Sequence, residues 1–497
     1  MAKERIEEWL LNQLAWSKLC QFVKKSMVIA RKIAYNVLVS SFSKILSTIL
    51  ALVAIGLITR YLGQAGFGNY AIVLAFLSFF TAIADLGIYS TVTREISRPE
   101  ADEENIIGNI FTLRVVISLL VLVLSPVIVF FFPYPAEVKE AIVVVALAFV
   151  FSSSYQTLNG VFQKNLAMDK VAIAELLGKI IQVLFIFYAI KLDLGFIWII
   201  FSLLLNMLVS FSLIYFLSRK YITFSLKYDL NYWKKFIKES YPLGAAAIIS
   251  FIYFKVDTIL LSILRDSAEV GIYNVAYKVI ENITFFPAMM VGLVFPIISK
   301  NIFFNNERFY EISNKTFKVF WIFVIPLIIG TIFLSDGIVN LIGGHGFSAS
   351  GTVLRILVFA LGCIFFSNLF NVILISGNKQ KKLMIIMLIA AIFNVAVNLI
   401  FIPHYSYIAA AIISVITELF VTVATFYVVA KDLGYFPRVE KFWAILASGI
   451  MMAVYFFIFS KINFFLLAFS GTAVYGLFIW LFKAVKTEEI ASIIVKK

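Results

Sequence analysis

Long apolar blocks, separated by short polar breaks, run through most of the chain from Asn36 to Phe482. A helix needs roughly 20 mainly apolar residues to cross the ~30 Å hydrocarbon core of a bilayer, and the blocks have this length. They predict helices over residues 37–59, 70–91, 107–132, 138–159, 171–190, 196–217, 242–263, 271–296, 316–334, 350–375, 383–402, 407–429, 442–460 and 462–482. The pattern therefore predicts an all-α polytopic membrane protein with about fourteen transmembrane helices.

The polar breaks divide the predicted helices into six, six and two. We expect a cytoplasmic amphipathic segment (1–35), an N-terminal six-helix lobe (36–217), a cytoplasmic basic linker (218–239), a C-terminal six-helix lobe (240–430), two extra helices (431–482) and a cytoplasmic tail (483–497). The two sixes resemble each other, because residues 66–70 and 269–273 match at an offset of 203 residues. An even repeat gives both lobes the same orientation, which predicts pseudo-symmetry about the membrane normal and a site between the lobes.

Composition supports a membrane protein and excludes several other classes. Hydrophobic residues make up 62% of the chain and charged residues 14%, whereas soluble domains are near half apolar and a quarter charged. The cysteines Cys20 and Cys363 are far apart and form no CxxC pattern, so neither a metal site nor a disulfide framework is expected. We also expect no cofactor.

Basic residues in the short loops predict the orientation. With a cytoplasmic N-terminus, 31 of the 42 Lys and Arg residues fall on the cytoplasmic side and five on the other. This asymmetry predicts a plasma (inner) membrane protein with both termini in the cytoplasm. It also accounts for the net charge of +14 through topology and contact with anionic lipids, without a nucleic-acid partner.

The N-terminal segment is expected to remain in the mature protein, because it lacks the short apolar core and small-residue cleavage site of a leader. Ile6, Trp9, Leu10 and Leu14 recur at helical spacing, and basic residues follow them. This pattern is typical of a helix that lies on an anionic membrane surface. A polar tail is the alternative.

Cations inside the predicted helices are candidate substrate ligands, because each costs roughly 2.5–3.5 kcal/mol at bilayer depth and normally faces a polar cavity. Lys44, Arg114 and Lys179 lie near the cytoplasmic ends of their helices, and Lys255 and Lys278 near the outer ends. Their positive charge predicts an anionic cargo, which would pass from the first group to the second as the lobes rock.

Acids at bilayer depth are either coupling groups or structural partners of these cations. They are Asp85, Asp257, Glu281 and Glu418. We expect Asp257 to pair with Lys278 and Glu281 with Lys255. The other two acids would bind a proton or a cation that drives transport, and a neutral hydrogen-bonded carboxyl is the alternative.

Several stretches resemble the polysaccharide transporter family of the MOP superfamily, the Wzx-type O-antigen flippases. They are Thr59-Arg60-Tyr61-Leu62-Gly63, Phe67-Gly68-Asn69-Tyr70, Asp85-Leu86-Gly87, Thr93-Arg94-Glu95, Tyr253-Phe254-Lys255-Val256-Asp257-Thr258, Gly271-Ile272-Tyr273, Ala276-Tyr277-Lys278 and Phe295-Pro296. The resemblance implies a V-shaped body of two lobes around a central cavity, with the last two helices outside it. It also implies that a polyprenyl diphosphate oligosaccharide is moved to the outer leaflet for cell-surface polysaccharide synthesis, with polymerases and glycosyltransferases as candidate partners.

Two other transport functions stay open: a MATE-like cation-coupled multidrug antiporter and a lipid II-type flippase. An antiporter for cationic compounds would require acids in the first-half cavity, where Asp85 is the main candidate. An enzyme of similar hydropathy would require a long loop with metal ligands or a catalytic base, and the longest polar connections are basic. We therefore expect no enzymatic activity.

Overall fold

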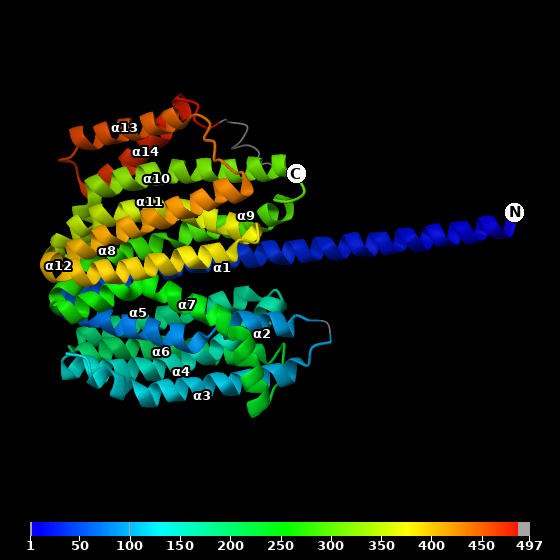
Figure 1. Ribbon diagram of the computed structural model, residues 1–497, viewed down its shortest axis with the longest axis horizontal. Coiled ribbons are helices and arrows are strands. Elements are labelled where there is room, and N and C mark those ends of the chain that lie inside the picture. The colour runs from blue at the N-terminus through cyan, green and yellow to red at the C-terminus, as the bar shows by residue number, and fades with distance from the viewer. Residues whose placement is uncertain (1, 99, 486–497) are drawn as a thin grey trace.

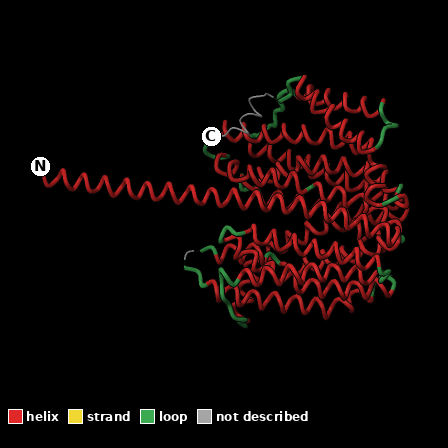
Figure 2. Tube along the Cα trace, turned by 180° about the vertical axis from the view of Figure 1, so that it is seen from behind, coloured by secondary structure: helices red, strands yellow, loops and turns green. Residues whose placement is uncertain are grey.

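The computed structural model describes residues 2–98 and 100–485, and within them the side chains of residues 2–34, 37, 242, 243, 246 and 247 are not described (Figures 1 and 2). Every regular element in the described part of the chain is helical. The elements are α1 (Ala2–Asp85), α2 (Ile88–Ile96), α3 (Glu103–Phe130), α4 (Ala136–Lys164), α5 (Met168–Lys191), α6 (Phe196–Ser218), α7 (Leu230–Leu264), α8 (Ser267–Ile283), α9 (Phe285–Asn301), α10 (Asn306–Gly343), η1 (His345–Phe347), α11 (Ala349–Ser376), α12 (Gln380–Leu433), α13 (Phe442–Ile458) and α14 (Phe464–Leu481).

Two of these helices each contain two membrane spans joined by a tight reversal. α1 has a non-helical residue at Gly63, and α12 has one at Ser406. In α12 the Lys382 ammonium lies 2.6 Å from the Asp432 carboxylate, so the two ends of the helix meet at the same face of the protein. Positive φ at Gly63 (67°) suits glycine, which has no Cβ to oppose this conformation.

The number of spans agrees with the sequence prediction. Ten helical segments of the described chain are long and apolar enough to cross a membrane, and two of them are the doubled helices. α13 is a shorter apolar helix, and α7 has the length of a further span. The protein is thus an all-α, multi-pass membrane protein with fourteen spans, as predicted.

Two predicted helices are interrupted in the structure. The helix predicted over 70–91 ends at Asp85, and α2 begins after Leu86 and Gly87, which both have positive φ. The helix predicted over 271–296 is broken at Thr284 into α8 and α9. Pro287 explains this break, because its ring cannot donate a backbone hydrogen bond and clashes with the carbonyl of Ile283.

The helices form two groups with α1 and α7 between them (Figure 1). α3 to α6 lie together on one side, and α8 to α12 on the other. α13 and α14 pack against each other and against α10 at the edge of the second group. This arrangement agrees with the expected six, six and two, although α7 already begins within the predicted linker at Leu230.

The connections gather at two opposite ends of the bundle. One end holds the ion pairs of Lys164 with Glu103 and of Lys382 with Asp432. The N-terminal part of α1 projects far beyond this end (Figure 2). The side chains on which the amphipathic prediction rests lie outside the described part, as do residues 486–497 of the predicted tail.

The repeated motifs of the two lobes meet at the opposite end. Gly68 packs against the backbone of Ser267, and Gly271 packs against the backbone of Gln64. A Cβ on Gly68 would lie 3.1 Å from the Gly271 nitrogen, and a Cβ on Gly271 would lie 3.1 Å from the Gly68 nitrogen. Gly68 and Gly271 are 203 residues apart, and so are Gln64 and Ser267, so this seam between the lobes reflects the sequence repeat. Only glycine permits this backbone approach.

Candidate functional site

Four of the five predicted substrate ligands lie close to one another between the two lobes. Lys44 lies on α1, Lys179 on α5, Lys255 on α7 and Lys278 on α8, so both lobes contribute. Lys179 lies within range of electrostatic repulsion from Lys44 and Lys278. The sequence had placed these residues at two different depths. The electrostatic interaction of Lys179 with Lys278 places members of the two groups within range of each other, and the difference in depth stays a prediction.

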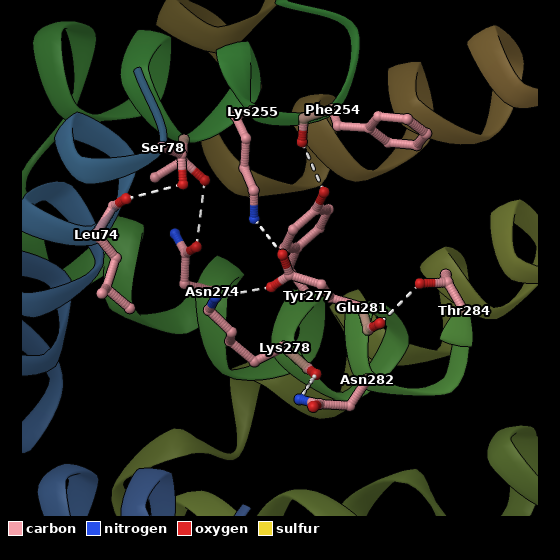
Figure 3. A network of polar contacts seen from close by, with 11 residues as sticks. Leu74, Ser78, Phe254, Lys255, Asn274, Tyr277, Lys278, Glu281, Asn282 and Thr284 are labelled. Atoms are coloured by element: carbon pink, nitrogen blue, oxygen red, sulfur yellow. Dashed lines mark hydrogen bonds and ion pairs between the residues drawn. The ribbon is translucent and has the colours of Figure 1, made fainter. Parts of the chain in front are cut away.

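A carboxylate joins two of these lysines (Figure 3). One oxygen of Glu281 lies 2.5 Å from the Lys255 ammonium, and the other lies 2.7 Å from the Lys278 ammonium. The predicted pairing of Lys255 with Glu281 is therefore confirmed. The side chain of Lys255 is 18% exposed, that of Glu281 34% and that of Lys278 20%, so a ligand can reach them.

Neighbouring groups fix the geometry of this trio (Figure 3). The Lys255 ammonium lies 4.9 Å from the centre of the Tyr277 ring, a distance at which a cation is attracted to the ring face. The Tyr277 hydroxyl donates to the Phe254 carbonyl at 2.6 Å. α8 ends at Ile283, directly after Glu281, and the negative end of its dipole favours cations at this position.

The other two lysines lie on the facing side of the cluster. The Lys44 ammonium is 5.7 Å from the centre of the Phe285 ring, at the start of α9. The Lys179 ammonium donates to the Gln182 side-chain oxygen at 3.0 Å, which also accepts from Asn206. Glu175 lies one helical turn from Lys179 and within electrostatic range of Lys44. We define the cationic cluster as the lysines Lys44, Lys179, Lys255 and Lys278.

The fifth predicted ligand, Arg114, is not part of the cationic cluster. Its side chain is only 1% exposed, and its guanidinium pairs with the Asp85 carboxylate. It also donates to the Gln156 side chain at 3.4 Å. A buried guanidinium with a dedicated carboxylate is not available to a ligand. The structure thus favours a structural role for Arg114 and Asp85, and the substrate role of Arg114 and the coupling role of Asp85 stay predictions.

Asp257 does not pair with Lys278, contrary to the sequence prediction. Its carboxylate accepts hydrogen bonds from Ser414 at 2.6 Å, Asn398 at 2.8 Å and the Tyr273 hydroxyl at 3.1 Å. These donors come from α8 and both spans of α12. They satisfy a buried carboxylate without a cation, because each donor compensates for the loss of water.

A cavity of about 380 Å³ opens beside the cationic cluster within the second lobe. Its lining includes the ion pair of Lys255 and Glu281 and the acids Asp257 and Glu418. The other polar and aromatic lining residues are Tyr253, Phe254, Tyr277, Thr284, Asn368, Asn394, Ser414 and Thr417. The cavity therefore combines one ion pair with two further acids and several hydrogen-bonding groups.

Sequence reasoning missed the polar residues that surround Asp257 at this cavity. Asn394, Asn398 and Ser414 are uncharged residues inside apolar blocks, so neither hydropathy nor charge distinguishes them from structural polar residues. Pro287 was a usable signal for the break beside Glu281, because proline inside a helix usually kinks it. Within the described residues, no group of three or more His, Cys, Asp or Glu could hold a metal ion.

The fold and this central site define the class: a multi-pass helical membrane protein with a polar site between two groups of helices. A family model described as "Polysaccharide biosynthesis protein" matches residues 33–302, which is more than half of the chain. The chain therefore belongs to this family of polysaccharide biosynthesis proteins. The MatE family model also matches, over residues 242–400.

Curated relatives carry names from glycan biosynthesis. The chain is 23% identical over 290 residues to the teichuronic acid biosynthesis protein TuaB of Bacillus subtilis, and this match covers 56% of the chain and 58% of TuaB. It is 25% identical over 302 residues to the probable low-salt glycan biosynthesis flippase Agl15 of Haloferax volcanii, covering 60% of the chain and 62% of Agl15. The match thus spans about three fifths of each relative.

A solved structure shows the same fold over nearly the whole chain. The lipid II flippase MurJ, in an inward closed conformation, superposes with a TM-score of 0.70. The superposition covers 90% of this chain and 99% of MurJ, at 17% sequence identity. This likeness establishes the fold, including the two lobes and the peripheral pair.

Proposed function

We propose that the protein is a flippase that moves a polyprenyl-diphosphate-linked oligosaccharide from the cytoplasmic to the outer leaflet by alternating access. The cationic cluster carries this proposal. Its four lysines are accompanied by the carboxylates of Glu175 and Glu281, so the cluster has a formal excess of two positive charges when all six groups are charged. Such an excess is costly in a membrane unless an anion neutralises it during function.

The chemistry of a lipid-linked diphosphate suits this site. A diphosphate diester carries two negative charges, and Lys ammonium groups bind phosphate oxygens through charge-assisted hydrogen bonds. The acidic and amide-lined cavity next to Lys255 offers donors and acceptors to a polar glycan. The names of the relatives, which refer to glycan biosynthesis and to a flippase, support the same substrate class.

The proposed orientation follows from the loop charges. The end of the bundle that holds Lys164 and Lys382 would face the cytoplasm, and the seam of Gly68 and Gly271 would face outward. Anionic lipids would contact the basic end, and glycosyltransferases and a polymerase would act before and after transport. A Lys461→Cys variant without the native cysteines tests the orientation: an impermeant maleimide added to intact cells should label it, and protection would refute it.

Coupling is proposed to involve the acids of the second lobe. Asp257 and Glu418 are 4% and 7% exposed and line the cavity, whereas Asp85 is held by Arg114. Binding of a proton or a cation at either acid would change the charge beside Lys255. Glu418→Gln should abolish any dependence of transport on an ion gradient, and an unchanged dependence would exclude Glu418.

Two alternative functions remain. A MATE-like antiporter is favoured by the acidic interior of the second-lobe cavity and by the match to the MatE model. A lipid II-type flippase is favoured by the superposition on MurJ. Replacing Lys255 and Lys278 by alanine should raise the transport activity of an antiporter for cationic compounds. The same replacements should lower the transport activity of a flippase for diphosphate-linked saccharides.

Complementation of a strain that lacks its oligosaccharide flippase tests the proposal. Lys255→Ala and Lys278→Ala variants should fail to restore surface glycan, and Lys→Arg variants, which keep the charge, should restore part of it. Membrane levels of each variant serve as the control for folding. Full surface glycan with both lysines replaced by alanine would contradict the proposed function.

A further inference from the structure

Glu281 is the one carboxylate in the described chain whose two oxygens pair with two members of the cationic cluster. It holds Lys255 at 2.5 Å and Lys278 at 2.7 Å, at the place where the proposed function puts the substrate's diphosphate. An incoming anion therefore meets lysines that already have an anionic partner. Glu281 is also 34% exposed, so a ligand that arrives from the cavity can reach it.

We propose that Glu281 is a specificity-determining residue: a tethered competitor that admits diphosphate diesters and excludes the singly charged phosphodiesters of ordinary membrane lipids. This inference rests on the proposed function and concerns the selectivity of the same site. Phosphodiester lipids greatly outnumber a lipid-linked oligosaccharide in a membrane. A bare pair of lysines open to the bilayer would be occupied by them.

The physical basis is a comparison of anions. A phosphodiester has one negative charge and two free oxygens, which is what the Glu281 carboxylate already supplies. Replacing the Glu281 carboxylate by a lipid phosphodiester on the lysines therefore gains little binding free energy. The carboxylate is also attached to the protein, which gives it a high effective concentration. A diphosphate diester brings two charges and four free oxygens. It can displace Glu281 or bind beside it on the remaining N–H groups of both lysines.

Glu281 lies beside an interruption of its membrane-spanning helix. It lies on the last turn of α8, and the helix stops at Ile283. The backbone continues through Thr284, whose hydroxyl donates to the Glu281 carbonyl at 2.7 Å. Discontinuous transmembrane helices are common at transporter substrate sites, because the helix ends present polar backbone groups and dipoles to the ligand.

Selectivity of this kind uses repulsion as well as attraction. Removing the Glu281 charge should leave the affinity for a diphosphate unchanged or higher, while the lysines become open to any anion. A positioning role predicts the opposite, because the lysines would then need Glu281 to hold them in place. The two roles therefore give different results for the same Glu281→Gln variant.

The experiment measures binding of a short-chain polyprenyl diphosphate N-acetylglucosamine to the full-length protein in nanodiscs. One set of discs contains phosphatidylcholine alone, and the other contains an equal share of phosphatidylglycerol, a singly charged phosphodiester. Wild-type protein should bind the probe equally well in both. Glu281→Gln should bind at least as tightly as wild type in phosphatidylcholine and about tenfold or more weakly once phosphatidylglycerol is present.

A matched control is available on the exposed basic end. Glu311 also bridges two cations, Arg308 and Lys315, each at 2.6 Å, but lies outside the cavity. Glu311→Gln should behave as wild type in both discs. Three results would overturn the inference: weaker binding by Glu281→Gln in phosphatidylcholine, equal binding by this variant in both discs, or competition by phosphatidylglycerol against the wild type.

A separate variant distinguishes failure of the inference from failure of the proposed function. Lys255→Ala with Lys278→Ala should lose most of the probe binding in phosphatidylcholine discs, where no anionic lipid competes. Unchanged binding by this double variant would refute the diphosphate site itself. Loss of binding there, combined with any of the three results above, would refute only the role of Glu281.

Discussion

The two lobes are alike at their outer seam and unlike in their buried charges. In the first lobe, Arg114 and Asp85 form a pair whose guanidinium is 1% exposed. In the second, Lys255, Glu281 and Lys278 form a trio that stays 18–34% exposed beside a cavity. Ion pairs of similar chemistry thus have different roles in the two places. Burial without access favours a structural role, and partial exposure at a cavity favours a ligand.

The largest effect is expected from breaking the buried pair. Asp85→Asn leaves the Arg114 guanidinium buried without an opposite charge, which should cost about 3–5 kcal/mol of unfolding free energy. Thermal unfolding in detergent should show this as a much lower midpoint. The double change Asp85→Leu with Arg114→Leu should recover most of the loss, because replacing both partners by apolar groups removes the uncompensated charge.

A different result for that pair would restore the interpretation made from sequence. If Asp85→Asn unfolds like the wild type but abolishes transport, Asp85 acts as a coupling acid. The structural role assigned to the Arg114–Asp85 pair of the first lobe would then be wrong.

An intermediate effect is expected at the seam where the lobes resemble each other. Gly68→Ala and Gly271→Ala each place a Cβ against the backbone of the opposite lobe, and each should cost about 1–3 kcal/mol. The two costs should be similar, because the contacts are related by the repeat. Gly292→Ala on α9, where a Cβ meets nothing within 4 Å, is the matched control and should not destabilise.

The smallest effect on stability is expected in the cationic cluster. Lys255→Ala or Lys278→Ala should change the unfolding free energy by clearly less than the about 3–5 kcal/mol expected for Asp85→Asn, because Glu281 keeps one cationic partner in either variant. The same unfolding assay measures it. A loss as large as that of Asp85→Asn would mean that the trio is structural, and the distinction between the lobes would disappear.

Much of the fold could be predicted from the sequence, because span length and apolar runs respond directly to bilayer thickness. The break at Leu86 and Gly87 between α1 and α2, and the interruption at Thr284, were missed because Gly87 and Pro287 act on backbone geometry, which hydropathy does not record. The repeat at Gly68 and Gly271 correctly indicated related positions, and the structure added that they touch.

The site was predicted in part for an equally physical reason. Charge at bilayer depth identified Lys44, Lys179, Lys255 and Lys278, which do come together. It could not separate them from Arg114, because accessibility depends on tertiary packing rather than on position along a helix. The partners of Asp257 were missed for the same reason, since they come from distant helices.

Translocation in proteoliposomes tests the central claim most directly. The protein is reconstituted, and transfer of a fluorescent short-chain polyprenyl diphosphate saccharide between leaflets is followed by quenching. Lys255→Ala with Lys278→Ala should abolish transfer, whereas Asp85→Leu with Arg114→Leu should retain it at comparable protein levels. Retained transfer without the two lysines, or its loss without the buried pair alone, would contradict the ligand role of the Lys255–Glu281–Lys278 trio and the structural role of the Arg114–Asp85 pair.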